Sequence, residues 1–288
     1  MQYIFLRKDV VKRRVTVSAT LVAESPLRVG SGQGETDPAS PAKLQLLKLN
    51  GVPVIPGSSW KGLFRSTGER VARGRGLRVC SGLSKENCVR EGIKDELQEY
   101  LKEGEFWEAL ALAWDKLCLN CKLFGTMSVR SQLTFKDSVL KGARTGVRTI
   151  VAISRTEGAV ARGALATVEY VEPGAEIPLE VLGTNLPNYA LGYLVLILRE
   201  LHTGGTQVGG FKSRGFGFVR VKDIEMRVEG GVREEGGRIV LEKVDEDPAD
   251  REVYVEKALF SRLDAEKFFK YAEPLVEVFE HAEIKYPQ

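Results

Sequence analysis

Four cysteines constrain the fold of this chain more strongly than any other feature, because the residues around them must bring them together. They come in two pairs, Cys80 and Cys88 separated by seven residues, and Cys118 and Cys121 separated by two. The N-terminal segment MQYIFLRKDVVKRR has neither the long apolar region nor the cleavage site of a secretory signal, so we expect a cytoplasmic protein without structural disulfides. Two thiolates spaced C-x2-C can share one tetrahedral cation. The sequence therefore predicts a closed, structural Zn²⁺ site formed by all four cysteines.

The cysteines lie within residues 74–126, which we expect to form an insertion with a helical stretch from about Ile93 to Leu117. Metal binding would contribute folding free energy to a lobe with little core of its own. Redox chemistry at CLNC, or four ordinary cysteines, are the alternatives to zinc.

The other segments predict an α+β fold with an antiparallel sheet. In chain order they are a strand over Val15–Glu24, a helix from Ser58 or Ser59 through Val71, three strand-like segments (Val147–Ile153, Ala164–Val171 and Ile177–Leu182), a helix over Tyr189–Leu201 and a strand over Phe216–Val221. This order is ferredoxin-like if two of the three middle segments form the central pair of the sheet. We therefore expect a core over residues 1–228 and a C-terminal extension over residues 229–288, with a strand near Glu252–Phe260 and a helix over Asp264–His281.

Charge is distributed unevenly along the chain, although its net value is only +3. Residues 1–222 carry 32 Lys and Arg against 21 Asp and Glu, whereas residues 223–288 carry 10 against 18. A basic body with an acidic extension favours a polyanionic partner for the body; scattered, solvated charge is the alternative. The longest apolar run, Tyr189–Leu198, is about half of a membrane span, so we expect a buried helix and no membrane partner.

The segment RGFGFVRV, Arg214–Val221, agrees at seven positions with the octamer of RNA-recognition motifs. In such a motif Phe216 and Phe218 would stack on bases. However, only about twelve residues separate the end of the preceding helix from the octamer, which leaves no room for the strand that an RNA-recognition motif requires there. We therefore expect the octamer to be the last strand of a ferredoxin-like unit, and a stand-alone RNA-recognition module is the alternative.

Three segments of the chain carry a resemblance to a known family: GVPVIPGSSWKGLFR (Gly51–Arg65), CLNCKLFG (Cys118–Gly125) and GGFKSRGFGF in the late glycine loop. They resemble the RAMP superfamily of CRISPR systems, in particular the backbone subunits of type III effector complexes, and CLNCKLFG is similar to a zinc-bearing insertion of some of those subunits. The resemblance covers residues 12–228. It implies a subunit for antiviral defence that associates with other RAMP subunits and with further copies along a CRISPR guide RNA, which pairs with complementary target RNA.

Two segments are expected to hold the ribose-phosphate backbone. The start of the first helix offers N–H groups to a phosphate, and glycines in the late loop let the backbone approach closely. A further cation lies between the first two middle strand-like segments. The candidate RNA-binding residues are Gly57, Ser58, Ser59, Lys61, Arg65, Arg155, Gly209, Gly210, Lys212, Arg214 and Gly215. Glycines that only form a turn, beside solvated cations, are the alternative.

The resemblance also implies a candidate for RNA cleavage. In type III backbone subunits that cleave target RNA, an aspartate in the loop after the first strand is implicated, and here this loop contains Asp37 in GETDPASP. Asp37 could hold Mg²⁺ or Mn²⁺, or help activate a ribose hydroxyl. Family members often have this aspartate directly before Ser-Pro, where Ala39 stands here, so a merely solvated acid is the alternative. A guide-processing endoribonuclease of the same superfamily, acting alone on repeat RNA, is another alternative, although its usual histidine is not evident among His202 and His281. A zinc-containing interaction protein without nucleic acid is the remaining alternative.

Overall fold

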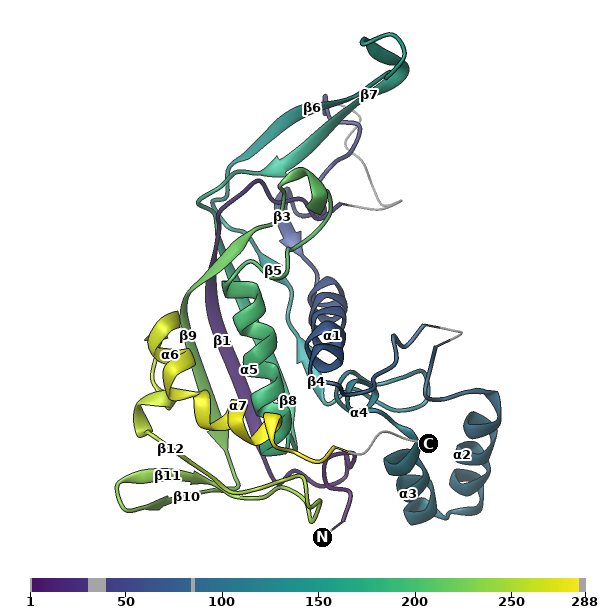
Figure 1. Ribbon diagram of the computed structural model, residues 1–288, viewed down its shortest axis with the longest axis vertical. Helices are drawn as coiled ribbons and strands as arrows, with labels where there is room; N and C mark the ends of the chain where they lie inside the picture. Colours follow the sequence, from purple (N-terminus) through teal and green to yellow (C-terminus); the bar gives the residue numbers. More distant parts are fainter. Residues whose placement is uncertain (1, 31–39, 84–85, 285–288) are drawn as a thin grey trace.

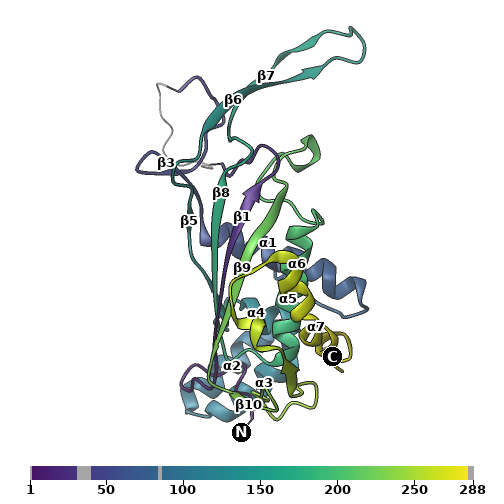
Figure 2. The ribbon, with the colours of Figure 1, turned by 90° about the vertical axis from the view of Figure 1, so that its left-hand side faces the viewer.

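The computed structural model describes residues 2–30, 40–83 and 86–284. The candidate Asp37 lies outside the described residues. The described strands and helices form an α+β fold with antiparallel sheets (Figures 1 and 2).

The largest sheet is built around the first long strand. Its strand order is β13 (Leu263–Asp264), β9 (Val219–Glu229), β1 (Arg14–Ala23), β8 (Glu176–Thr184) and β4 (Leu133–Phe135), and each neighbouring pair is antiparallel. Val17 of β1 lies opposite Val181 of β8 and Met226 of β9. Alternate residues of β1 are buried, as the sequence predicts, so one face of the sheet contributes to the core.

Helices pack on this apolar face (Figure 2). They are α1 (Gly57–Gly74), α5 (Asn188–His202), α6 (Ala265–Tyr271) and α7 (Glu273–Glu280). The run Tyr189–Leu198 is buried within α5. A Cβ atom at Gly192 would lie 2.0 Å from the carbonyl oxygen of Leu275, so glycine allows α5 and α7 to pack backbone against backbone. Among the described residues, none of the helices has the length and apolar character needed to cross a membrane.

The middle strand-like segments differ from the expected arrangement. Strands β6 (Thr145–Ile153) and β7 (Val160–Val171) pair with each other in a two-stranded ribbon that projects from the rest of the chain (Figures 1 and 2). Only β8 joins the largest sheet, and β4 takes the position beside it. None of the β6 residues is buried, so its apolar residues do not report a core position. The three residues of β4 are too few for alternation to be detected in the sequence.

Short strands form two further three-stranded sheets. They are β2 (Lys48–Leu49), β3 (Val52–Ile55) and β5 (Ser138–Val139) in one sheet, and β10 (Val232–Glu235), β11 (Arg238–Leu241) and β12 (Val253–Val255) in another.

The insertion contains α2 (Glu91–Glu103), α3 (Phe106–Lys116) and α4 (Leu119–Phe124). The helical stretch expected over Ile93–Leu117 is thus divided between α2 and α3. Gly104, with φ of 80°, ends α2 in a left-handed cap that favours glycine.

The C-terminal extension packs closely on the core. Strand β13 pairs with β9, and the Asp250 carboxylate accepts the backbone N–H of Asn188 at 2.8 Å, which satisfies the first turn of α5. The single helix expected over Asp264–His281 is divided between α6 and α7, because Pro274 has no N–H to continue α6 and is accommodated in the first turn of α7.

Candidate nucleic-acid interface and metal centre

The four cysteines come together in the part of the insertion that faces α1. The Cys80 Sγ atom lies 3.2 Å from that of Cys121, 3.5 Å from that of Cys88 and 3.7 Å from that of Cys118. All four Sγ atoms lie within 4.8 Å of one another. A tetrahedral ion with metal–sulfur bonds of about 2.3 Å separates its ligands by about 3.8 Å, so these four thiols can hold a metal ion such as zinc. Hydrogen bonds among the four thiols lower the pKa of Cys80 and Cys118 and raise the pKa of Cys88 and Cys121, so without a metal ion the cluster shares its protons unequally.

Arg65 contacts this cluster directly. Its Nη2 lies 3.3 Å from the Cys121 Sγ, and its Nη1 donates to the carbonyl oxygen of Gly125 at 2.9 Å. A Cβ at Gly82 would lie 2.2 Å from Nη2, so the loop after α1 also packs against the guanidinium. Arg65, a candidate RNA-binding residue, therefore joins α1 to the insertion.

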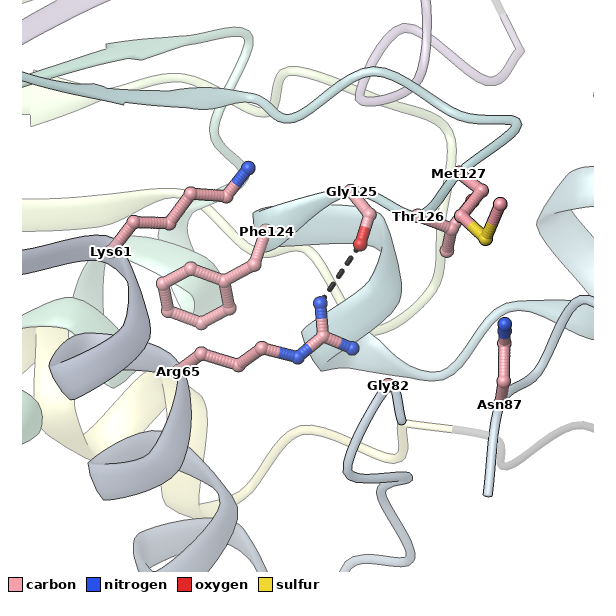
Figure 3. Close-up of a pocket in the computed structure, with 8 residues that line it drawn as sticks. All are labelled: Lys61, Arg65, Gly82, Asn87, Phe124, Gly125, Thr126 and Met127. Atoms are coloured by element: carbon pink, nitrogen blue, oxygen red, sulfur yellow. Dashed lines mark hydrogen bonds between the residues drawn. The ribbon is translucent and has the colours of Figure 1, made fainter. Parts of the chain in front are cut away.

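A cavity of about 270 Å³ lies beside Arg65 (Figure 3). Lys61 and Arg65 extend into it from α1, towards the residues that follow α4. Burial, and then the charge of Arg65, lower the pKa of Lys61. Within the described ranges, Lys61 forms an ion pair with no carboxylate, so an anion in this cavity would stabilise its charged form. The lining residues are Lys61, Arg65, Gly82, Asn87, Phe124, Gly125, Thr126 and Met127.

A side-chain carboxylate of the protein already accepts a hydrogen bond at the start of α1. The backbone N–H of Gly57 donates to the Asp137 Oδ1 at 2.7 Å, which is the position that the sequence assigned to a phosphate. A Cβ at Gly57 would lie 2.2 Å from the carbonyl oxygen of Phe135, so this glycine is required for packing against β4. Ser58 and Ser59 are exposed, and neither caps the helix through its side chain.

The glycine loop packs on the segment that follows β1. The Gly210 N–H donates to the carbonyl oxygen of Arg28 at 2.8 Å, and the Gly217 N–H to that of Pro26 at 2.9 Å. Gly209 has φ of 80°, and a Cβ there would lie 2.1 Å from the Arg28 carbonyl oxygen. Gly215 also has a positive φ, 79°, but a Cβ there would meet open space. Glycine is favoured at this position by its backbone conformation and not by close packing.

Cations gather around this loop. The exposed Lys212 and Arg214 stand on a short 3-10 turn, and the guanidinium of Arg214 lies 5.4 Å from the Phe211 ring centroid. Arg28 lies over the same ring at 5.3 Å, and Arg148 of β6 lies 5.5 Å from the Phe216 ring centroid. The fifth is Arg70, whose charge contributes after burial to lowering the pKa of Lys212. We call these five residues the loop cations: Arg28, Arg70, Arg148, Lys212 and Arg214.

The segment that leads into the glycine loop contacts the middle of α1, and not the start of the helix as the sequence predicts. The Thr67 and Thr206 hydroxyls lie 3.0 Å apart, and the Arg70 Nη1 donates to the carbonyl oxygen of Gly205 at 3.0 Å. Ser58 precedes Arg70 by twelve residues, or about 18 Å of helix. The sequence analysis did not include Arg28, Arg70 or Arg148 in the site, although Arg28 is a cation at the start of the long loop after the first strand. Arg155 is exposed in the turn of the β6–β7 ribbon, which extends away from the rest of the chain (Figure 1).

Ion pairing distinguishes the loop cations from those on the largest sheet. No carboxylate in the described part of the chain pairs with a loop cation. By contrast, Lys222 pairs with Glu176 at 2.7 Å and Arg227 with Glu225 at 2.5 Å. A polyanion therefore meets unpaired positive charge at the glycine loop, whereas Lys222 and Arg227 on the sheet are already paired.

The two phenylalanines of the octamer occupy different environments. Phe216 is 1% exposed and packs edge-on against Tyr170, with ring centroids 6.0 Å apart, whereas Phe218 is 37% exposed. An RNA-recognition motif would present both rings to bases. The burial of Phe216 argues against that alternative.

The family model of the RAMP superfamily matches residues 20–220 of this chain, from within β1 to the start of β9. The chain belongs to the RAMP superfamily. This confirms the family predicted from the three sequence segments, and it suggests a CRISPR-associated, RNA-binding function. No curated protein matches the chain. The matched range of this RAMP protein includes the cysteine insertion and the glycine loop, and it ends before the C-terminal extension.

Replacing Phe216 by alanine is expected to lower the free energy of unfolding by about 3–5 kcal/mol, because a buried ring is lost. Phe218→Ala is the matched control and is expected to cost about 1 kcal/mol or less. Urea unfolding followed by circular dichroism measures both values. Equal, small costs for the two variants would show that Phe216 is available for stacking.

Proposed function

We propose that this RAMP protein is a guide-RNA-binding backbone subunit of a type III CRISPR effector complex in antiviral defence. The observation that carries the proposal is the group of loop cations around a glycine loop, none of which pairs with a described carboxylate. Such a surface binds phosphates without reading sequence, and pairing between guide and target RNA then supplies specificity.

The topology supports a ferredoxin-like core for this function. Strands β1, β4, β8 and β9 follow the chain order strand, helix, strand, strand, helix, strand, with α1 after β1 and α5 after β8. In space these four strands are ordered β9, β1, β8 and β4. The cysteine insertion lies between α1 and β4, so it interrupts this unit at one place.

The exposed side of α1 offers a path for the RNA. Ser58, Gly62 and Ser66 are exposed at four-residue intervals, and Arg70 continues the same row to the glycine loop. Small side chains let a strand lie close to the helix, and the row spans about 18 Å, which is enough for several nucleotides. The Lys61 cavity lies beside this row and the loop cations lie at its end.

The β6–β7 ribbon supports association with other RAMP subunits or further copies. Val151, Ile153 and Leu165 are 42%, 64% and 49% exposed on it. Exposed apolar side chains on a projecting ribbon favour contact with a neighbouring molecule.

The cysteine cluster contributes a structural Zn²⁺ ion to this proposal. All ligand positions would be filled by thiolates, which leaves no open position for water. Through Arg65 the ion would also fix the wall of the Lys61 cavity, since the guanidinium contacts both Cys121 and Gly125.

For target cleavage we propose Asp37 as the residue that holds Mg²⁺ or Mn²⁺, from the sequence resemblance alone. In an assembled complex, Asp37→Ala is expected to abolish cleavage of complementary RNA while guide binding stays unchanged. Gel analysis of a labelled target measures cleavage, and Glu35→Ala is the control within the same loop. Unchanged cleavage by Asp37→Ala would remove this residue from the mechanism.

The affinity for single-stranded RNA is expected to fall steeply with salt. The double variant Lys212→Ala/Arg214→Ala should reduce the slope of log K against log salt by about 1.4, because each phosphate contact on a single strand contributes about 0.7. Fluorescence anisotropy over a series of salt concentrations measures the slope.

The matched control is Lys222→Ala/Arg227→Ala, which removes two paired cations from the sheet. This control should leave the slope unchanged. An equal effect of the two double variants would mean that general charge, not the glycine loop, determines binding.

Metal analysis of the purified protein is expected to find about one zinc per chain. Chelation should lower the melting temperature by about 5 °C or more, because each kcal/mol corresponds to about 2–4 °C for a chain of this size. Cys118→Ser and Cys80→Ser should each remove the metal, whereas Ser81→Ala should retain it. A metal content below about a tenth per chain would contradict the site.

A further inference from the structure

A second cavity lies beside α2 and α3 of the insertion, and Met127 lines both this cavity and the Lys61 cavity. It has a volume of about 530 Å³ and is bounded by α2, α3, the segment Met127–Arg130 and Leu6 of the N-terminal segment. Its floor is apolar and buried, with Leu97, Leu110 and Ala113 all less than 10% exposed. We call this cavity the insertion groove.

The rim of the insertion groove leaves large apolar side chains open to solvent. Leu101 is 58% exposed, Phe106 is 40% exposed and Met127 is 91% exposed. On α2 the lining residues Lys94, Leu97, Gln98 and Leu101 follow the spacing of a single helix face over about two turns. An apolar helix face of this kind is normally covered, so the groove has the character of an interaction surface.

The charged groups at the groove all have the same sign. The titratable lining residues are Lys94 and Arg130, both exposed, and no carboxylate in the described ranges pairs with either. Lys8 lies nearby: burial, and then the charge of Arg130, lower the pKa of Lys8 to about 8. The groove therefore combines an apolar floor with unpaired positive charge.

We propose that the insertion groove binds an acidic amphipathic helix of a partner protein. Apolar side chains of that helix, spaced three and four residues apart, would fill the floor. Its carboxylates would pair with Lys94 and Arg130. Met127 suits such an interface, because its unbranched side chain can adapt to the shape of a partner.

Two other occupants fit the groove less well. A single-stranded RNA would find mainly aliphatic side chains, with Phe106 as the one aromatic ring among the lining residues. A second copy of this chain would have to offer an acidic helix with a free apolar face. The acidic extension has its helices α6 and α7, but their apolar residues Phe268, Leu275 and Phe279 are already buried.

The test uses a helical peptide of about 16 residues, with Leu at positions spaced three and four apart, Glu at the positions that flank the Leu face, and Ala elsewhere to keep the peptide helical. A matched peptide carries Lys in place of every Glu. Fluorescence anisotropy with the full-length protein is expected to show binding of the Glu peptide and at least tenfold weaker binding of the Lys peptide. Leu101→Ser and Lys94→Glu should each weaken binding of the Glu peptide about tenfold.

Two control variants come from the same insertion. Leu83→Ser changes an apolar residue that is 72% exposed and does not line the groove. Lys102→Glu reverses a charge on another face of α2. Both controls should bind the Glu peptide like the unchanged protein. Because the mutated side chains are exposed, all four variants should retain the unfolding temperature.

Several results would overturn the proposal. They are equal binding of the two peptides, no binding of either, displacement of the peptide by single-stranded RNA, and self-association of the chain that Leu101→Ser abolishes. The affinity of Leu101→Ser for RNA should equal that of the unchanged protein, which separates this groove from the proposed RNA surface.

Discussion

The backbone contact between the glycine loop and the segment after β1 determines where the charged groups of this protein lie. Gly209 can lie against the Arg28 carbonyl oxygen only because it has no side chain. The contact places the turn Lys212–Arg214 near Arg28, and Phe211 is a shared cation–π partner of the Arg28 and Arg214 guanidinium groups. Segments separated by about 180 residues thus form one cationic surface.

Charge pairing decides which of the many cations are available to a partner. On the sheet and in the C-terminal extension, many Lys and Arg are matched by neighbouring Glu and Asp, as in the pair Arg233–Glu252 at 2.8 Å. Such exposed pairs contribute little to stability, but they neutralise the local potential. The loop cations have no such match among the described residues. Their mutual repulsion is a cost to the folded chain that a bound polyanion would relieve.

The cysteine insertion is connected to the core through a side chain that serves both. Arg65 belongs to α1, yet its guanidinium contacts the Cys121 sulfur and the Gly125 carbonyl oxygen. An arginine fork can make these contacts at once, whereas a lysine could not. The metal centre and the cavity wall beside Lys61 are therefore parts of one arrangement.

The sequence predicted the features that depend on local pattern or on spacing. The strand β1, the buried helix α5, the proximity of the cysteines and the RAMP family could all be inferred from it. It could not predict which middle segment enters the largest sheet, because β4 has only three residues and β6 shows apolar residues without a core.

The sequence also could not predict the roles of residues whose contacts lie far away along the chain. Asp137 takes the N–H of Gly57 from a segment 80 residues away, and Arg28 and Arg148 join the site only through tertiary contacts. The candidate Asp37 lies outside the described residues, so its role stays a prediction.

Crosslinking can show whether RNA follows one path over the glycine loop and the exposed side of α1. Single-stranded RNA containing 4-thiouridine can be crosslinked to the protein, and the modified peptides can be identified by mass spectrometry. We expect crosslinks in the glycine loop, in the segment around Arg28 and on the exposed side of α1. Crosslinks confined to the open face of the sheet around Lys222, or to the C-terminal extension, would contradict this expectation.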